Sequence, residues 1–481
     1  MSSSRTVAWA GVSQAGRIGL QMVTLVALSR LVPARDFGAF ALAGTITSLV
    51  FILRDMGTAA AVIQRKVVDD SLLSTVFWFN VMLGLGLGLI VAGTAPWVAH
   101  AFAEPAVAGL LLALAVGYPV ASSGAVHQAL LERQQRFKGL AFIEVGSALV
   151  GLGTAVAAAK ADMGAYSLVV NQLTITVVNA LGLWVVSGWR PSWHWSQAEF
   201  RSIYGYSSNL FGSQLLNYFA RNADAMLVGR FLGAQALGWY SMAYKLMLFP
   251  LYNLALVVAR ATFPKLSQVQ SDPALVAQGY FRSVRLISLL TFPLMSGLFV
   301  LREPFVETVL GKAWMPVADI LAWLCPVGLV QSITTTMGMI YMVTGRTKTM
   351  FRWGMFSTAA TLVGMFIGLS DGYLGVARCY AVVNALLFLP TCYFALSQIE
   401  VSVGRLLRAL APQCLCAALM GGVLWWAVPV LLGGQPAWLR LLAGVPLGMG
   451  VYAGLVVACM PDMRTMVMKQ LGRTRHSRGA S

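Results

Sequence analysis

The sequence predicts an all-α polytopic membrane protein with about fourteen transmembrane helices, on the evidence of its composition, the length of its apolar segments and its short loops. Of the 481 residues, 58% are hydrophobic and only 11% are charged, and the mean hydropathy is +0.74. A soluble chain of this size would have too little polar surface to cover its core. The bilayer is therefore the expected solvent.

Apolar segments long enough to cross a bilayer follow one another along almost the whole chain. A span takes about 20 apolar residues. Connecting turns such as 33–36, 160–163 and 433–436 leave no room for a folded domain outside the membrane. We expect spans at 8–31, 37–62, 72–98, 105–131, 138–159, 164–187, 206–230, 236–260, 282–301, 317–344, 350–369, 373–396, 408–431 and 437–460.

A weak internal repeat indicates that the chain contains two related halves. The matches, at an offset of 200 residues without gaps, include Arg30 with Arg230, Ala34 with Ala234, Gly38 with Gly238, Phe40 with Tyr240 and Gln14 with Gln214. Because six predicted spans separate the copies, both halves enter the membrane from the same side and are parallel repeats. We therefore expect two six-helix lobes around a central cavity.

The expected domains follow from this repeat. They are an N-terminal lobe at 1–187, an interfacial linker at 188–205, a C-terminal lobe at 206–396, two additional helices at 397–460 and a basic cytoplasmic tail at 461–481. Trp189, Trp193 and Trp195 suggest that the linker lies at the membrane interface. An aromatic platform that binds sugar is the alternative interpretation of these tryptophans.

Basic residues predict the orientation. An even number of spans places both termini on one side, where the loops carry about 22 Lys and Arg residues against about seven on the other side. The positive-inside rule makes the terminal side cytoplasmic. The net charge of +17 is then mostly topological, no nucleic-acid partner is expected, and the tail would contact anionic membrane lipids.

We expect no cofactor, metal site or cleaved signal peptide. The first apolar segment is interrupted by Arg17 and lacks a convincing cleavage site, so it should remain as a helix. All six cysteines fall inside predicted spans, without ligand-like spacing to the four histidines. This pattern indicates neither a disulfide framework nor a zinc site.

Three arginines far from any predicted interface are the leading candidates for a binding site. Arg17, Arg54 and Arg221 lie within the first, second and seventh spans. An arginine at the bilayer centre costs at least about 2.5 to 3.5 kcal/mol, so these side chains should face a wet cavity. Arg17 and Arg221 are one helical turn out of repeat register and can point to the same axis. Guanidinium groups suit phosphate oxygens, although each arginine could instead pair with a membrane carboxylate.

Three carboxylates inside the predicted spans are candidates for ion coupling. Asp55, Glu144 and Asp224 could titrate and couple transport to protons, or bind sodium. Structural counter-ions to the arginines are the alternative interpretation.

Three segments carry a family resemblance. They resemble the oligosaccharide flippases of bacterial polysaccharide export, and they lie at residues 57–66, 130–138 and 303–318. The third segment has Pro304, Gly311 and Trp314 at the spacing characteristic of that family. That family belongs to the multidrug/oligosaccharidyl-lipid/polysaccharide exporter superfamily. The resemblance implies two six-helix lobes around a V-shaped cavity, and two extra C-terminal spans are usual in its flippase branches.

The resemblance also implies a function. The cargo would be an oligosaccharide repeat unit linked to a polyprenyl pyrophosphate such as undecaprenyl pyrophosphate, moved across the bacterial inner membrane for exopolysaccharide, capsule or O-antigen assembly. Rocking of the lobes would alternate access, driven by exchange of a proton or sodium ion. A monomer is expected, with polymerase and chain-length proteins as possible partners.

Within this interpretation the candidate residues take roles. Arg17, Arg54 and Arg221 would hold the pyrophosphate, by analogy with the cationic cavity of the family. The sugars need polar groups, for which the candidates are Gln14, Gln214, Asn217 and Asn222.

Other functions remain open at this point. A drug exporter of the same superfamily would prefer an acidic or aromatic cavity, and a lipid II flippase carries a similar pyrophosphate. A membrane enzyme such as a polysaccharide polymerase or ligase would handle the same lipid. Such enzymes usually carry a large periplasmic loop, and the longest external segment here, 302–316, is too short. We therefore predict a transporter and not an enzyme.

Overall fold

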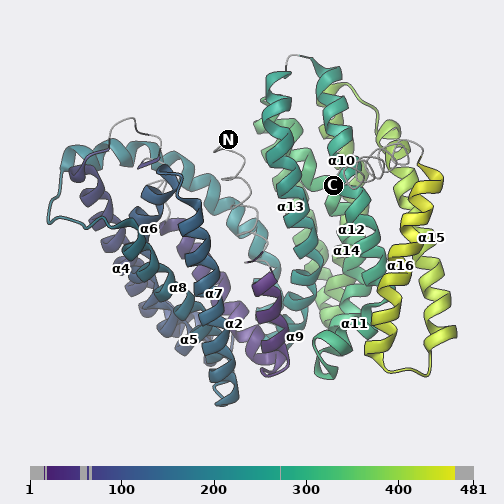
Figure 1. Cartoon of the computed structure of the whole chain (residues 1–481), viewed down its shortest axis with the longest axis horizontal. Helices are drawn as coiled ribbons and strands as arrows, with labels where there is room; N and C mark the ends of the chain where they lie inside the picture. Colours follow the sequence, from purple (N-terminus) through teal and green to yellow (C-terminus); the bar gives the residue numbers. More distant parts are fainter. Residues whose placement is uncertain are drawn as a thin grey trace, which may run out of the picture. The chain divides into compact units, whose positions relative to one another are not determined.

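The described part of the chain is built from helices alone. The computed structural model describes residues 16, 19–54, 62, 63, 65, 68–270 and 272–460, leaving out the side chains at 51–54 and in parts of α9. The long helices, shown in Figure 1, are α2 (Ala34–Arg54), α4 (Asp70–Ala101), α5 (Ala106–Ala115), α6 (Gly117–Arg133), α7 (Phe137–Lys160), α8 (Tyr166–Ser187), α9 (Gln197–Gln268), α10 (Pro273–Val300), α11 (Arg302–Val309), α12 (Met315–Val343), α13 (Thr347–Gly368), α14 (Gly372–Leu396), α15 (Val403–Leu432) and α16 (Ala437–Cys459).

The helices confirm a polytopic membrane protein. Among the described residues, nine segments are long and apolar enough to cross a bilayer, and Gly19–Ser29 is a shorter apolar helix. The predicted spans 138–159, 164–187 and 437–460 match α7, α8 and α16 to within two residues. Apolar length predicts these boundaries well because a helix satisfies all its backbone hydrogen bonds inside the bilayer.

Two segments that connect predicted spans contain helix. Residues 262–280, which connect the predicted spans 236–260 and 282–301 and were expected to be a loop, are mostly helical, because α9 continues to Gln268 and α10 begins at Pro273. The Asp272 carboxylate caps α10 by accepting from the backbone N–H groups of Ala274 (2.9 Å) and Leu275 (3.1 Å). Residues 302–316 also fold, into α11 and the 3-10 turn η1 (Lys312–Trp314).

The chain forms two compact units, residues 1–238 and 239–481, called here the N-terminal and C-terminal units. In the N-terminal unit α4 packs against α6, and α8 packs against both α6 and α7. In the C-terminal unit α12 packs on α10 and α14, and α15 packs on α10 and α16. The division falls inside α9, near its non-helical residue Gly233 (φ 83°, ψ 174°). The lobe boundaries expected from the sequence stay a prediction.

The two copies of the repeat meet inside the N-terminal unit, where α2 crosses α9. A Cβ atom added to Gly38 would collide with the carbonyl oxygen of Ala234, and one added to Gly238 would collide with that of Ala34. Each glycine therefore meets the alanine of the other repeat copy. A two-fold relation between the two copies produces such a reciprocal contact. The repeated glycines are explained by backbone packing, which a side chain would prevent.

Candidate functional site

Two of the three residues predicted to bind pyrophosphate belong to α2 and α9. Arg54 is the last residue of α2 and Arg221 lies on α9, but both side chains are outside the described part of the structure. Arg17 lies wholly outside the described residues. The pyrophosphate site therefore stays a prediction.

Some of the other predicted site residues also lie outside the described part of the structure, and some lie within it. Gln14 and Asp55 lie outside the described residues, as do the side chains of Gln214 and Asn217 on α9. The remaining candidates are Asn222, Asp224 and Glu144, and all are half-buried.

Two of these candidates bond to the backbone of their own helix, α9. The Asn222 amide donates to the carbonyl oxygen of Tyr218 at 3.0 Å, and the Asp224 carboxylate accepts from the N–H of Ala225 at 2.7 Å. The hydroxyl of Tyr218 in turn donates to the carbonyl oxygen of Thr45, which ties α9 to α2. The Asn222 and Asp224 side chains therefore bond within α9, and the Tyr218 hydroxyl joins this part of α9 to α2.

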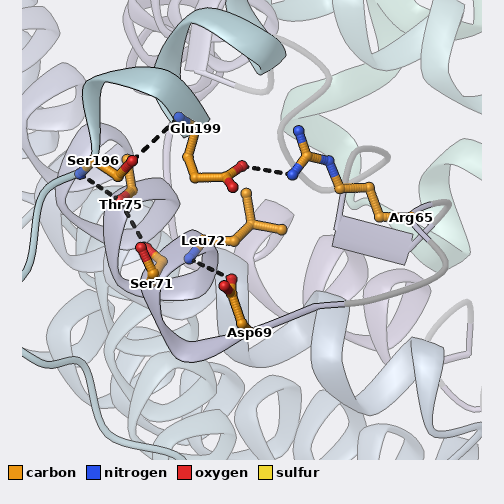
Figure 2. Close-up of polar contacts among 7 residues, drawn as sticks. All are labelled: Arg65, Asp69, Ser71, Leu72, Thr75, Ser196 and Glu199. Atoms are coloured by element: carbon orange, nitrogen blue, oxygen red, sulfur yellow. Dashed lines mark hydrogen bonds and ion pairs between the residues drawn. The ribbon is translucent and has the colours of Figure 1, made fainter.

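A network of hydrogen bonds and an ion pair lies at the predicted cytoplasmic end of the N-terminal unit (Figure 2). The Glu199 carboxylate pairs with Arg65 at 2.6 Å, and both side chains are partly buried. The N–H of Glu199 donates to the Ser196 hydroxyl (3.3 Å), and the N–H of Ser196 donates to the Thr75 hydroxyl (3.1 Å). The start of α9 is thereby attached both to α4 and to the segment that follows α2.

One arginine joins two of the three segments that carry the family resemblance. The Arg133 guanidinium, at the end of α6, donates to the carbonyl oxygens of Val62 (3.0 Å), Ile63 (3.3 Å) and Arg65 (2.5 Å). Val62 and Ile63 are helical and Arg65 lies outside regular structure, and backbone carbonyl groups without a backbone partner need such donors when water is scarce. The first two motifs therefore have a structural role within the described residues.

The tryptophans of the predicted linker pack on α4. The Trp78 indole donates to the carbonyl oxygen of Ser192 (2.9 Å), and its ring stacks on Trp193 with centroids 4.2 Å apart. The Trp189 indole donates to the Asp70 carboxylate (3.0 Å). Trp193 keeps 90% of its surface exposed, as a residue at a membrane interface would.

A second ionic cluster lies at the opposite end of the same unit. Arg35 pairs with the buried Glu104 at 3.2 Å, and the neighbouring Asp36 carboxylate lies against Gly164, which has a positive φ of 53°. Burial raises the pKa of Asp36, while Arg35 opposes that rise and Glu104 adds to it.

The N-terminal unit also contains a cavity of about 310 Å³ between α2, α5, α6 and α8. Its lining includes Phe40, Gly44, Tyr118, Gln172 and Thr176, and none of the lining residues is charged. None of these residues was among the sequence candidates. An uncharged amide inside the predicted sixth span, Gln172, was the signal that could have indicated the cavity.

The C-terminal unit has a polar network in the corresponding helices. The Gln331 amide on α12 donates to the Tyr380 hydroxyl on α14 at 2.6 Å, and the Tyr244 hydroxyl on α9 lies 3.3 Å from it. Nearby along α14, Arg378 pairs with Asp371 at 3.7 Å and lies over the Trp323 ring. Lys245, beside Tyr244 on α9, is exposed.

The described residues show no cluster of three or more His, Cys, Asp or Glu side chains that could hold a metal ion. The part of the chain that the structure describes is thus a polytopic bundle of helices long and apolar enough to cross a membrane, with a glycine-packed repeat contact and an uncharged pocket in its N-terminal unit. The solved structure of the lipid II flippase MurJ in an inward closed conformation has this fold, with a TM-score of 0.75 at 14% identity over 94% of this chain and 99% of that one.

The chain belongs to a family of polysaccharide biosynthesis proteins, whose family model matches residues 27–319. It is 25% identical over 469 residues to the teichuronic acid biosynthesis protein TuaB of Bacillus subtilis, covering 96% of each chain. It is also 25% identical over 482 residues to the succinoglycan biosynthesis transport protein ExoT of Rhizobium meliloti, covering 99% of this chain and 97% of the relative. These matches confirm the resemblance predicted from the three sequence motifs.

Proposed function

We propose that this protein moves a polyprenyl-pyrophosphate-linked oligosaccharide repeat unit from the cytoplasmic to the periplasmic leaflet of a bacterial inner membrane. The observation that carries the proposal is the nearly full-length match to relatives named for polysaccharide biosynthesis, one of them as a transport protein. The fold shared with a lipid II flippase supports a lipid-linked cargo.

The proposed mechanism is alternating access. The sugar and pyrophosphate head would pass through a central wet cavity while the polyprenyl tail stays in the bilayer. Arg17, Arg54 and Arg221 would hold the pyrophosphate through bidentate contacts. Gln14, Gln214, Asn217 and Asn222 would contact sugars. The motivation is their placement within spans, where uncompensated polar groups are costly.

Ion exchange would drive the cycle in this account. Asp55, Glu144 and Asp224 are the carboxylates available within the spans, and a proton or a sodium ion is the proposed counter-ion. Both termini would lie in the cytoplasm, as the distribution of Lys and Arg favours. The basic residues Arg65 and Arg133 would then share the cytoplasmic end of the N-terminal unit.

Deleting the gene tests this function. We expect lipid-linked repeat units to accumulate in the cytoplasmic leaflet and surface polysaccharide to disappear, with both restored by the wild-type gene on a plasmid. A lipid II flippase would instead be revealed by loss of peptidoglycan synthesis and cell lysis. Unpolymerised repeat units accumulating in the periplasm would favour a polymerase or ligase and contradict the proposal.

A further inference from the structure

The cavity of the N-terminal unit has the size of a small ligand site. Its volume is about 310 Å³, and it is a partly open pocket lined by residues of α2, α5, α6 and α8. Ligand pockets generally measure about 300 to 1,000 Å³, so this one has room for a single ring and not for a whole oligosaccharide. All its lining residues lie within one compact unit.

The cavity lies at a depth where lipid would surround a membrane helix. Phe40 and Gly44 are six and ten residues after Ala34, the start of α2, and Gln172 is six residues after Tyr166, the start of α8. At a rise of about 1.5 Å per residue these positions are roughly 9 to 15 Å from the helix ends. The hydrocarbon core is about 30 Å thick, so the few polar groups in this largely apolar lining need a polar partner at this depth.

The lining offers hydrogen-bonding groups without net charge. The Thr176 hydroxyl donates to the carbonyl oxygen of Gln172 (2.8 Å) and the Ser48 hydroxyl donates to that of Gly44 (2.7 Å), so both oxygens keep lone pairs for a ligand. The Gln172 side chain is half-buried, and its amide makes no hydrogen bond to the residues that the structure describes. That amide brings a donor and an acceptor together.

This chemistry selects between classes of ligand. An ion or a charged drug would find no charged partner among the lining residues, and an acyl chain would leave the Gln172 amide unsatisfied. A sugar ring presents neutral hydroxyls at its edge and C–H groups on its face. The half-buried ring of Phe40 offers apolar surface for that face.

The second half of the repeat shows that the architecture alone does not create this space. Gly44 corresponds to Tyr244 in the 200-residue register. The Tyr244 hydroxyl lies 3.3 Å from that of Tyr380 on α14, the repeat counterpart of α8. The same helices of the C-terminal unit therefore carry large side chains bonded to one another, whereas the N-terminal unit has a glycine and a cavity.

We propose that the cavity lined by Phe40, Gly44, Tyr118 and Gln172 binds one sugar residue of the transported oligosaccharide. This inference rests on the proposed function and adds a sugar subsite within the N-terminal unit. It makes the glycan, and not only the pyrophosphate, a determinant of cargo recognition.

The test fills the cavity and removes its amide. At Gly44 no atom lies within 4 Å of an added Cβ, so Gly44→Leu directs a side chain into the cavity, and Gln172→Leu removes the amide at similar size. Gly93→Leu is the matched control, because Gly93 on α4 also has no atom within 4 Å of an added Cβ and is exposed. Thermal unfolding of each purified full-length variant verifies that it is folded.

Binding is measured with two probes, the lipid-linked oligosaccharide isolated from the deletion strain and sugar-free polyprenyl pyrophosphate. We expect Gly44→Leu to weaken binding of the first probe about tenfold, a change of about 1.4 kcal/mol, and to leave the second unchanged. Gln172→Leu should act in the same direction, and Gly93→Leu should match the wild type.

The binding measurements distinguish failure of the sugar-site inference from failure of the proposed function. If folded Gly44→Leu and Gln172→Leu bind both probes as the wild type does, the cavity binds no sugar and the inference is overturned. Equal weakening of both probes would assign the cavity to the lipid and also overturn it. Failure of the wild-type protein to bind either probe would contradict the proposed function itself.

Discussion

Arginine side chains within the membrane carry the proposed recognition of pyrophosphate. Replacing Arg17, Arg54 or Arg221 with Ala should abolish export of surface polysaccharide without changing the amount of protein in the membrane, because each loses a cation from the cavity. The measurement is surface polysaccharide against protein level in a complemented deletion strain.

The control for these variants is Arg346→Ala, which removes an exposed arginine in the turn between α12 and α13. It should export normally. Wild-type polysaccharide in all three membrane-arginine variants would remove the argument for a cationic cavity.

The raised pKa of Asp36 predicts a pH dependence of stability. Because burial raises this pKa in the folded state, the folded protein binds the proton more tightly than the unfolded chain, and stability rises as the pH falls through the folded pKa. Asp36→Asn should remove that contribution. The difference in Tm between wild type and variant should therefore change between pH 7 and pH 4, with the wild type relatively more stable at the lower pH.

Comparing the Tm of the variant with that of the wild type isolates the contribution of Asp36, because the other carboxyl groups titrate in both proteins. An Asp36→Asn variant whose Tm follows that of the wild type at every pH would show that Asp36 has an ordinary pKa. Arg35 and Glu104 must stay unchanged in this experiment because both act on the Asp36 carboxyl group.

The contacts of individual residues were harder to predict from the sequence than the helices were. Membrane arginines and carboxylates can be found by their cost in lipid, but the partners of Arg133 are backbone carbonyl groups that no side-chain pattern reveals. The cavity beside Gln172 depends on which helices pack together, and Gly44 shows no sequence signal that separates it from other glycines in spans.

At the scale of the element, the crossing of α2 and α9 depends on glycine. Gly38→Ala should destabilise the protein by about 1 to 3 kcal/mol, because the new Cβ meets backbone that cannot move aside. Gly44→Ala on the same helix meets nothing within 4 Å and should be neutral or slightly stabilising. Thermal unfolding in detergent measures both, and equal stability of the two variants would contradict a close backbone contact at Gly38.

The third family motif should act through folding. Trp314 is 1% exposed and follows Gly311, whose φ of 104° favours glycine. Trp314→Ala should cost about 3 to 5 kcal/mol and lower the amount of protein in the membrane. Export per folded molecule should stay near the wild-type value.

Protein level and export, measured together, decide between a structural and a ligand-binding role. A Trp314→Ala protein present at wild-type level but unable to export would assign Trp314 to cargo binding. The same measurement on Trp193→Ala gives a control, since Trp193 is 90% exposed and its loss should leave stability nearly unchanged.

Helices were predictable where the bilayer dictates their length, as in α7, α8 and α16. They were less predictable where a helix continues into water. The stretch at 262–280 looked like a loop because it is polar, but the Asp272 cap and Pro273 start α10 well before the apolar segment begins. Polarity marks the end of a span and does not mark the end of a helix.

At the scale of the molecule, the internal repeat predicted two related halves, and the structure adds a reciprocal glycine contact between its copies. The two halves of the repeat differ in the side chains that their equivalent helices carry. One has an uncharged cavity between α2, α5, α6 and α8, and the other has a hydrogen-bonded tyrosine pair in the counterpart helices. This asymmetry suits a cargo whose two ends differ in chemistry.

Transport of the lipid-linked oligosaccharide by the purified protein is the sharpest test of the proposed flippase function. The protein is reconstituted in vesicles with this lipid and a proton or sodium gradient, and an impermeant reagent that modifies sugars reports which leaflet holds the glycan. We predict that wild-type protein moves the glycan between leaflets and that Arg221→Ala does not. A folded wild-type protein that leaves the glycan in its original leaflet under both gradients would contradict the account.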